Sequence, residues 1–188
     1  MDLIGRDHTV ITLRPIGYAH PELLSLDGYD WVRVFGHVEE PTGSWSFEGE
    51  SLLTSELQEL SAWLHGVIDG SVPTSANWNE EHAAALKRAG KDLLYTESGG
   101  HIGGLYPGIG FTGEDLSLSL VRRSADSVNL AVSFSEVNQL PHEPMPHLNR
   151  RSESYLLPTS AADLKSAVDK WDLECSALVA QTSEEAAN

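Results

Sequence analysis

The clearest structural pattern of the 188-residue chain lies in residues 31–51, WVRVFGHVEEPTGSWSFEGES. Residues 31–38 form an apolar, β-branched run typical of a strand, and a Pro-Thr-Gly turn sequence follows them. From residue 44 to 51 apolar and polar residues alternate, and successive side chains of a strand point to opposite faces. The alternation sets Trp45 and Phe47 against Ser46, Glu48 and Glu50. The pattern predicts an antiparallel hairpin with one solvated face.

A helix is predicted directly after this hairpin. Thr54 or Ser55 is the expected N-cap, and Ser55 with Gln58 has the spacing of a capping box. Gly70 is the expected terminator, because glycine readily adopts the left-handed conformation that ends helices. Five apolar residues recur at helical spacing and predict one buried stripe: Leu57, Leu60, Leu64, Val67 and Ile68.

Weaker patterns predict the remaining elements. Strands are expected at residues 10–13, 93–96, 116–121 and 128–134, the last two forming a second hairpin. A short helix is expected at 80–89, a glycine-rich loop or bulged hairpin at 99–113, and a proline-rich irregular segment at 138–152. A final helix is expected after Pro158, with Ser160 and Asp163 at capping distance.

These elements predict an α+β fold, a mostly antiparallel sheet of about six strands with helices packed on one face. Strands that follow one another in hairpins argue against a doubly wound parallel sheet. We expect a single globular domain over residues 1–180 and a polar C-terminal tail over 181–188. No signal peptide, membrane span or cysteine pair is visible, so the expected location is cytoplasmic.

Charge is the strongest global property of the sequence. The chain has 12 basic and 28 acidic residues, a net charge of −16. Such a surface repels phosphate backbones and anionic membranes, so neither nucleic acid nor membrane is an expected partner. A basic protein would be attracted instead, with a rate that falls as salt increases. The acidity also has a simpler explanation, which is solubility alone.

Two motifs resemble ligand sites but lack the context that such sites need. Residues 108–113 match G-x-G-x-x-G, yet the motif must open a helix to hold a pyrophosphate, and Glu114 and Asp115 would repel one. His142 and His147 are five residues apart with prolines between them, so they cannot share a helix face as zinc ligands. We therefore predict a hairpin loop and a surface loop, with no metal and no cofactor.

Three further features leave more than one interpretation open. Glu48 and Glu50 share a strand face, where paired carboxylates are more often a solvated surface than an acid/base pair. Cys175 lies on the apolar stripe of the last helix and is expected to be an unreactive core thiol. Trp78 lies in a polar loop, where it either anchors a protein interface or packs back onto the preceding helix.

The strand–helix junction also resembles a known family. Trp45-Ser46-Phe47-Glu48-Gly49-Glu50, followed by Thr54-Ser55-Glu56-Leu57 and Leu60-Ser61-Ala62-Trp63-Leu64, is similar to the WapI-type immunity proteins of bacterial polymorphic toxin systems. The resemblance covers residues 31–70, with a looser match over 114–136. It implies a non-enzymatic inhibitor that covers the basic face of a toxin acting on nucleic acid. The matching positions are of core and cap type, so no functional residue is transferred.

The leading hypothesis is an acidic protein-binding module, an immunity-like inhibitor of a basic toxin of the nuclease type. Its expected contact residues are Glu39, Glu40, Glu48, Glu50, Glu56, Glu59 and Trp78. One alternative is a small enzyme or ligand-binding protein that uses loop 98–113 with His101, Glu114 and Asp115. Another is a structural protein that self-associates through a sheet edge. The oligomeric state stays open.

Overall fold

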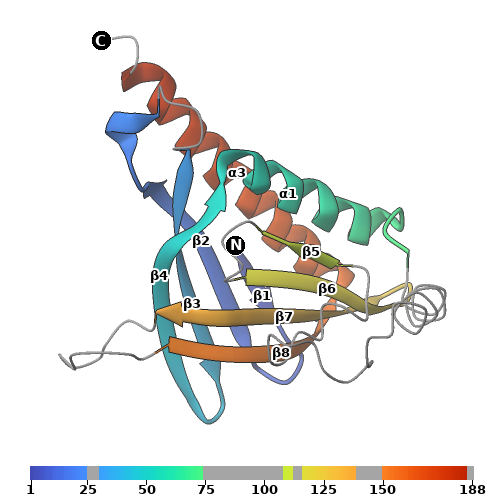
Figure 1. Ribbon diagram of the computed structural model, residues 1–188. Helices are drawn as coiled ribbons and strands as arrows, with labels where there is room; N and C mark the ends of the chain where they lie inside the picture. The colour runs from blue at the N-terminus through green and yellow to red at the C-terminus, as the bar shows by residue number, and fades with distance from the viewer. Residues whose placement is uncertain (25–29, 74–107, 112–115, 139–149, 186–188) are drawn as a thin grey trace, which may run out of the picture.

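The computed structural model describes residues 1–24, 30–73, 108–111, 116–138 and 150–185 (Figure 1). Side chains are described for these residues except 135–138, 150–152 and 181–185. Two four-stranded antiparallel sheets and two helices make up this part of the chain. The predicted strand 93–96 and helix 80–89 lie outside the described residues, as does most of the irregular segment 138–152.

The first sheet is built from the N-terminal strands in chain order. Its strands are β1 (Asp2–Ile4), β2 (Val10–Tyr18), β3 (Trp31–Glu40) and β4 (Gly43–Leu53). A short 3-10 helix, Pro21–Leu23, follows β2. The predicted hairpin of residues 31–51 is confirmed as β3 and β4, with Trp31 opposite Leu53 and Glu40 opposite Gly43.

The second sheet is also a meander in chain order. Its strands are β5 (Gly108–Gly110), β6 (Leu116–Arg123), β7 (Ser127–Asn138) and β8 (Arg150–Ser160). The predicted second hairpin is confirmed as β6 and β7. Strand β8 was not predicted, because Pro158 suggested the start of a helix. Pro158 lies instead within β8, which is an edge strand, where the missing N–H of proline breaks no hydrogen bond of the sheet.

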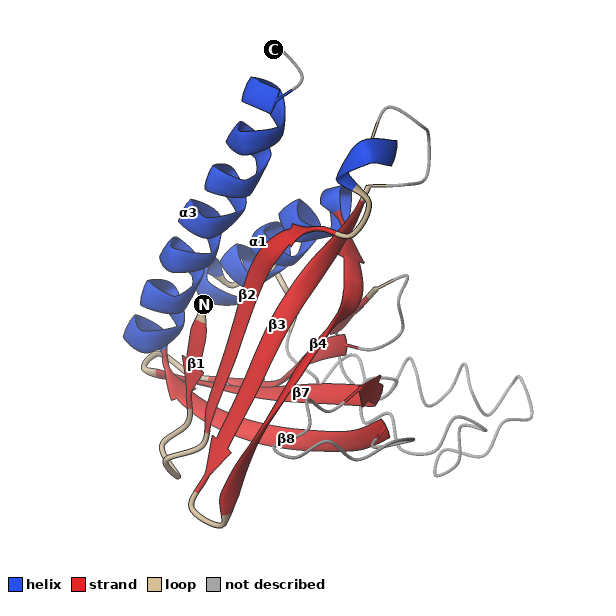
Figure 2. Cartoon of the chain, turned by 90° about the vertical axis from the view of Figure 1, so that its left-hand side faces the viewer, coloured by secondary structure: helices blue, strands red, loops and turns tan. Residues whose placement is uncertain are grey.

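The α+β class is confirmed, whereas the prediction of one sheet of about six strands is wrong. The strands of the two sheets run across one another, and the helices lie together on one side (Figures 1 and 2). Alternation within a strand indicates which side chains are buried, but it does not indicate which other strand lies beside it in a sheet. The four strands before α1 in the chain form one sheet, and the four strands after it form the other. No local pattern in the sequence indicates this division.

The first helix, α1 (Thr54–Asp69), begins one residue earlier than the predicted caps require. Leu53 occupies the N-cap position, and its backbone N–H donates to the Glu56 carboxylate at 2.7 Å. The prediction that Thr54 or Ser55 caps the helix is wrong, because Thr54 donates its hydroxyl to the Asp30 carbonyl instead. The predicted terminator is confirmed: Gly70 has φ 96° and its N–H bonds the Gly66 carbonyl.

The last helix, α3 (Ala161–Glu185), has the predicted cap. Ser160 Oγ accepts a hydrogen bond from the Asp163 backbone N–H at 3.0 Å and donates to its carboxylate. The helix runs into the segment 181–188 that the sequence analysis set apart as a polar tail. Trp171 is fully buried on its inner face, and its Nε1 donates to the Leu57 carbonyl of α1 at 3.2 Å.

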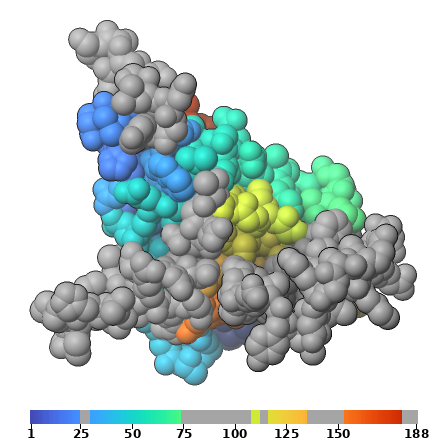
Figure 3. Space-filling model, viewed as in Figure 1, coloured from blue at the N-terminus to red at the C-terminus, as the bar shows by residue number. Residues whose placement is uncertain are grey.

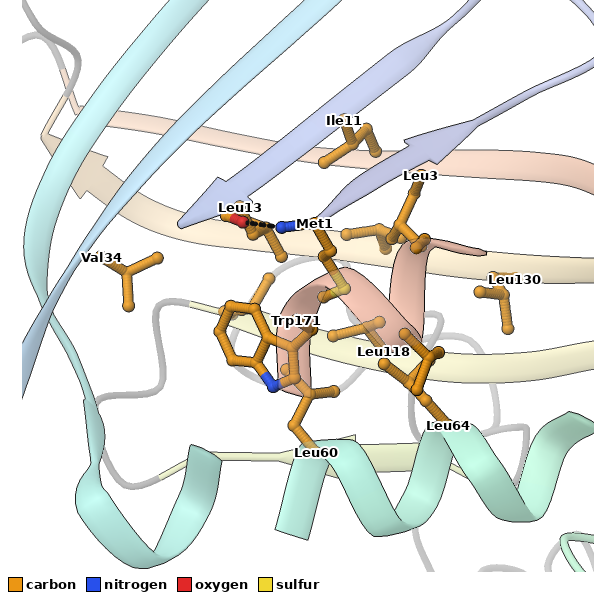
Figure 4. Close-up of a cluster of buried hydrophobic side chains, with 14 of the residues drawn as sticks. Met1, Leu3, Ile11, Leu13, Val34, Leu60, Leu64, Leu118, Leu130 and Trp171 are labelled. Atoms are coloured by element: carbon orange, nitrogen blue, oxygen red, sulfur yellow. Dashed lines mark hydrogen bonds between the residues drawn. The ribbon is translucent and has the colours of Figure 1, made fainter. Parts of the chain in front are cut away.

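The hydrophobic core is shared by both sheets and both helices (Figure 4). Trp45 and Phe47 from β4 meet Phe134 from β7, with ring centroids 5.3 and 5.2 Å from the Phe134 ring. Phe47 also lies directly over Gly36 of β3, where a Cβ atom would be 1.9 Å from the ring. At the other side of the core the Met1 amino group donates to the Leu13 carbonyl.

Candidate partner-binding surfaces

The β3–β4 hairpin carries four of the predicted contact residues. Glu39 pairs in register with Ser44, Glu48 with Phe35, and Glu50 with Arg33. Alternation sends Glu39, Glu48 and Glu50 to the face opposite the buried Trp45 and Phe47 side chains. The solvated face that the sequence predicted is therefore present, and three carboxylates lie on it.

Glu40 is directed differently from the other three glutamates. It approaches the Tyr155 hydroxyl on β8, which also accepts a 2.9 Å hydrogen bond from Trp45 Nε1 and donates to Glu153. Burial raises the pKa of Tyr155, and hydrogen bonds to Glu153 and Glu40 raise it further. Tyr155 therefore stays protonated as a hydrogen-bond donor where the two sheets meet.

Basic residues divide the acidic hairpin face. Arg33 forms an ion pair with Glu48. Arg14 follows on β2, opposite Phe35, with its guanidinium 4.0 Å from the Asp2 carboxylate. Glu50 lies 3.7 Å from the His20 ring. The face is thus mixed, with an excess of carboxylates rather than an unbroken negative patch.

The remaining predicted contact residues lie apart from the hairpin. Glu56 is only 7% exposed, and its carboxylate accepts the Leu53 N–H at the start of α1. Glu59 is exposed on α1, which forms part of the molecular surface in Figure 3. Trp78 lies outside the described residues. The structure therefore assigns Glu56 the role of a helix cap and leaves Glu59 on a separate exposed element.

The glycine-rich segment is described only in part. Gly108–Gly110 forms β5, which pairs with β6, so the start of the G-x-G-x-x-G motif is a strand rather than a helix N-terminus. A Cβ atom on Gly108 would be 2.5 Å from Ser119 Oγ, which explains this glycine by strand packing. The other residues of the enzyme hypothesis, His101, Glu114 and Asp115, lie outside the described residues, as do His142 and His147.

A groove between α1 and α3 was not predicted from the sequence. It has a volume of about 700 Å³ and is lined by Thr54, Leu57, Gln58, Ser61, Ala62, His65, Asp172, Cys175, Ser176, Val179 and Ala180. Asp172 of α3 accepts hydrogen bonds from Ser61 Oγ at 2.5 Å and from His65 Nε2 at 2.9 Å. Helical periodicity places Ser61 and His65 on one face of α1, but nothing local to either helix specifies that they meet.

The polar groups of this groove do not form a nucleophile. In a catalytic triad the imidazole lies between serine and carboxylate, whereas here the Asp172 carboxylate lies between Ser61 and His65. Burial raises the pKa of the Cys175 thiol to about 12, and the nearby Asp172 and Glu174 carboxylates contribute to the shift. At neutral pH the thiol is therefore protonated, and the thiolate is the reactive form of cysteine.

Within the described ranges, no three His, Cys, Asp or Glu side chains gather as a metal-binding group. No helix in the same part of the chain is long and apolar enough to cross a bilayer.

The described residues thus present two distinct surface features, the carboxylates of the β3–β4 hairpin and the groove between α1 and α3. The chain belongs to the immunity protein WapI-like family, whose sequence model matches residues 2–178. The resemblance seen over residues 31–70 and 114–136 is thereby confirmed over nearly the whole chain. No curated protein and no solved structure matches the chain with significant similarity.

Proposed function

We propose that this protein neutralises a basic toxin of the nuclease type by binding it in the cytoplasm, without catalysis or a cofactor. Membership of an immunity protein family supports a toxin as the partner. The net charge of −16 supports a partner of opposite sign, because complementary potentials accelerate encounter and select against like-charged partners. Residues 1–180 act as one domain in this proposal.

The observation that carries the proposal is the position of Glu39, Glu48 and Glu50 on one face of the β3–β4 hairpin. A paired hairpin fixes the backbone from which these side chains extend, so little backbone entropy is lost when a partner binds. Arg33 orients Glu48, while Glu39 and Glu50 remain exposed and accessible to lysine or arginine side chains. Glu40, Glu59 and Trp78 are proposed as further contacts.

The test measures association with the protein encoded by the neighbouring gene, by biolayer interferometry at several salt concentrations. The double variant Glu39→Gln/Glu50→Gln is expected to slow association about tenfold at low salt, because rim charges act mainly on the association rate. Its matched control is Asp126→Asn/Asp169→Asn, which removes two exposed carboxylates elsewhere and is expected to stay within about twofold.

Two outcomes would overturn the proposal in different ways. If the wild-type protein does not bind the neighbouring gene product, the immunity function fails. If it binds with a rate that does not depend on salt, the partner is not held by charge and the basic-toxin mechanism fails.

A further inference from the structure

The groove between α1 and α3 has walls that are mostly apolar. Leu57 and Ala62 contribute from α1, and Val179 and Ala180 contribute from α3. An open apolar groove of about 700 Å³ has the dimensions of a site for one or more side chains of a ligand.

One negative charge is fixed inside this groove. Ser61 and His65 hold the Asp172 carboxylate from the opposite helix, and its side chain is still 37% exposed. Among the described residues that line the groove, none is a lysine or an arginine. The negative potential is also felt by Cys175, since Asp172 and Glu174 contribute to the raised pKa of its thiol. A ligand that fills the groove must therefore combine apolar surface with a positive charge.

Charge decides between the candidate occupants. A second copy of this chain carries the same net charge of −16 and would bring acidic surfaces together. A basic protein has the complementary charge for Asp172. Strand β4 leads directly into α1 (Figure 2), and Thr54, which lines the groove, follows Glu50 by four residues.

We propose that the α1–α3 groove binds a segment of the cationic toxin in which an apolar side chain lies next to a lysine or arginine. The apolar side chain packs between Ala62 and Val179, which are exposed on the two helices, and the cation pairs with Asp172. This inference rests on the proposed function and adds a second, partly apolar contact to the charged hairpin. Desolvated apolar contacts act mainly on the dissociation rate, whereas the hairpin carboxylates act mainly on association.

The test compares tryptophan substitutions at two exposed alanines of the same helix. Ala180→Trp fills the groove, whereas Ala177→Trp adds the same side chain one turn away at a position that does not line it. With the neighbouring gene product as probe, Ala180→Trp is expected to raise the dissociation constant at least about tenfold through faster dissociation. Ala177→Trp is expected to stay within about twofold.

A second pair of variants tests the charge. Asp172→Asn keeps the shape of the side chain and is expected to weaken binding about tenfold and to reduce its dependence on salt. The control Asp169→Asn removes a carboxylate that pairs with Lys165 on the same helix and is expected to change neither quantity. Circular dichroism and thermal melting confirm that each variant is folded.

The outcomes separate this inference from the function on which it rests. Absence of wild-type binding overturns the proposed function and the groove assignment with it. Salt-dependent wild-type binding that Ala180→Trp and Asp172→Asn leave unchanged overturns the groove assignment alone. Wild-type self-association in sedimentation, abolished by Ala180→Trp, would show that a second copy occupies the groove and would also overturn it.

Discussion

Individual charged residues in this protein connect elements that are distant in the sequence. Asp2 of β1 accepts a 2.6 Å hydrogen bond from Lys170 of α3 and a 2.9 Å hydrogen bond from Thr12. Asp172 of α3 similarly receives two side chains of α1. Carboxylates that pair within the protein are less available to a partner. The net charge therefore overestimates the number of carboxylates that can contact one. The exposed hairpin glutamates are the ones that the proposed function uses.

The Asp2 carboxylate gives a prediction for the pH dependence of stability. Burial opposes its ionisation, but hydrogen bonds from Lys170 and Thr12 outweigh burial and lower the pKa of Asp2. A pKa lowered by folding stabilises the protein above the unfolded value near 4, and the contribution is lost as pH falls through the folded value. Asp2→Asn should therefore cost about 0.5 kcal/mol at pH ~7 and less at pH ~3.

Urea denaturation at the two pH values measures this difference. Asp169→Asn is the control, because Asp169 pairs with Lys165 within one exposed helix turn and joins no second element. An Asp2→Asn cost that is equal at both pH values would contradict the assigned role of the ionised carboxylate.

Helix α1 is fixed at its start by one of its own side chains and at its end by a side chain from another element. At its start the Glu56 side chain accepts the Leu53 N–H. At its end Arg123 of β6 donates to the carbonyls of Val67, Gly70 and Val72 at 3.0–3.1 Å. A cation at a helix C-terminus also interacts favourably with the helix dipole. The second sheet therefore holds the end of a helix that follows the first sheet in the chain.

Removal of this guanidinium should destabilise the protein. Arg123→Ala leaves three carbonyls without their donor and is expected to cost about 1–3 kcal/mol. Arg122→Ala, at the exposed neighbouring position, is expected to change stability by less than about 0.5 kcal/mol. Chemical denaturation measures both, and hydrogen exchange should show faster opening of the last turn of α1 in Arg123→Ala only. Equal costs for the two variants would contradict the cap.

At the scale of the molecule, one hydrophobic cluster joins both sheets and both helices of the described part of the chain. Phe134 from the second sheet packs edge-on against Trp45 and Phe47 from the first. Strand β1 contacts β8, and α3 contacts strands of both sheets. With the core shared in this way, neither sheet buries its inner face without the other. We therefore expect the described sheets and helices to unfold together.

A cavity at the junction of the sheets tests this cooperativity. Phe134→Ala is expected to cost about 3–5 kcal/mol, because it removes a buried ring and leaves unfilled space. Hydrogen exchange should accelerate in β3 as much as in β7. Leu156→Ala, at a position 55% exposed on β8, is the control and should cost less than about 1 kcal/mol. Protection lost from the second sheet alone would show that the sheets unfold separately.

The sequence by itself determined the local elements of this protein. Alternating residues specified both hairpins, Ser160 and Asp163 specified the start of α3, and Gly70 specified the end of α1. These features depend on side-chain periods and hydrogen bonds between near neighbours, so they can be predicted from short segments. The same local junction around residues 45–64 carried the resemblance to the family to which the chain belongs.

Only the tertiary structure decided the division into two sheets, the inclusion of β8, and the groove between α1 and α3. Ser61 and Asp172 are 111 residues apart, and the sequence around each indicates only a polar residue on a helix. Their meeting depends on how two helices pack over a shared core, which is set by the total shape of the buried surfaces rather than by any local pattern.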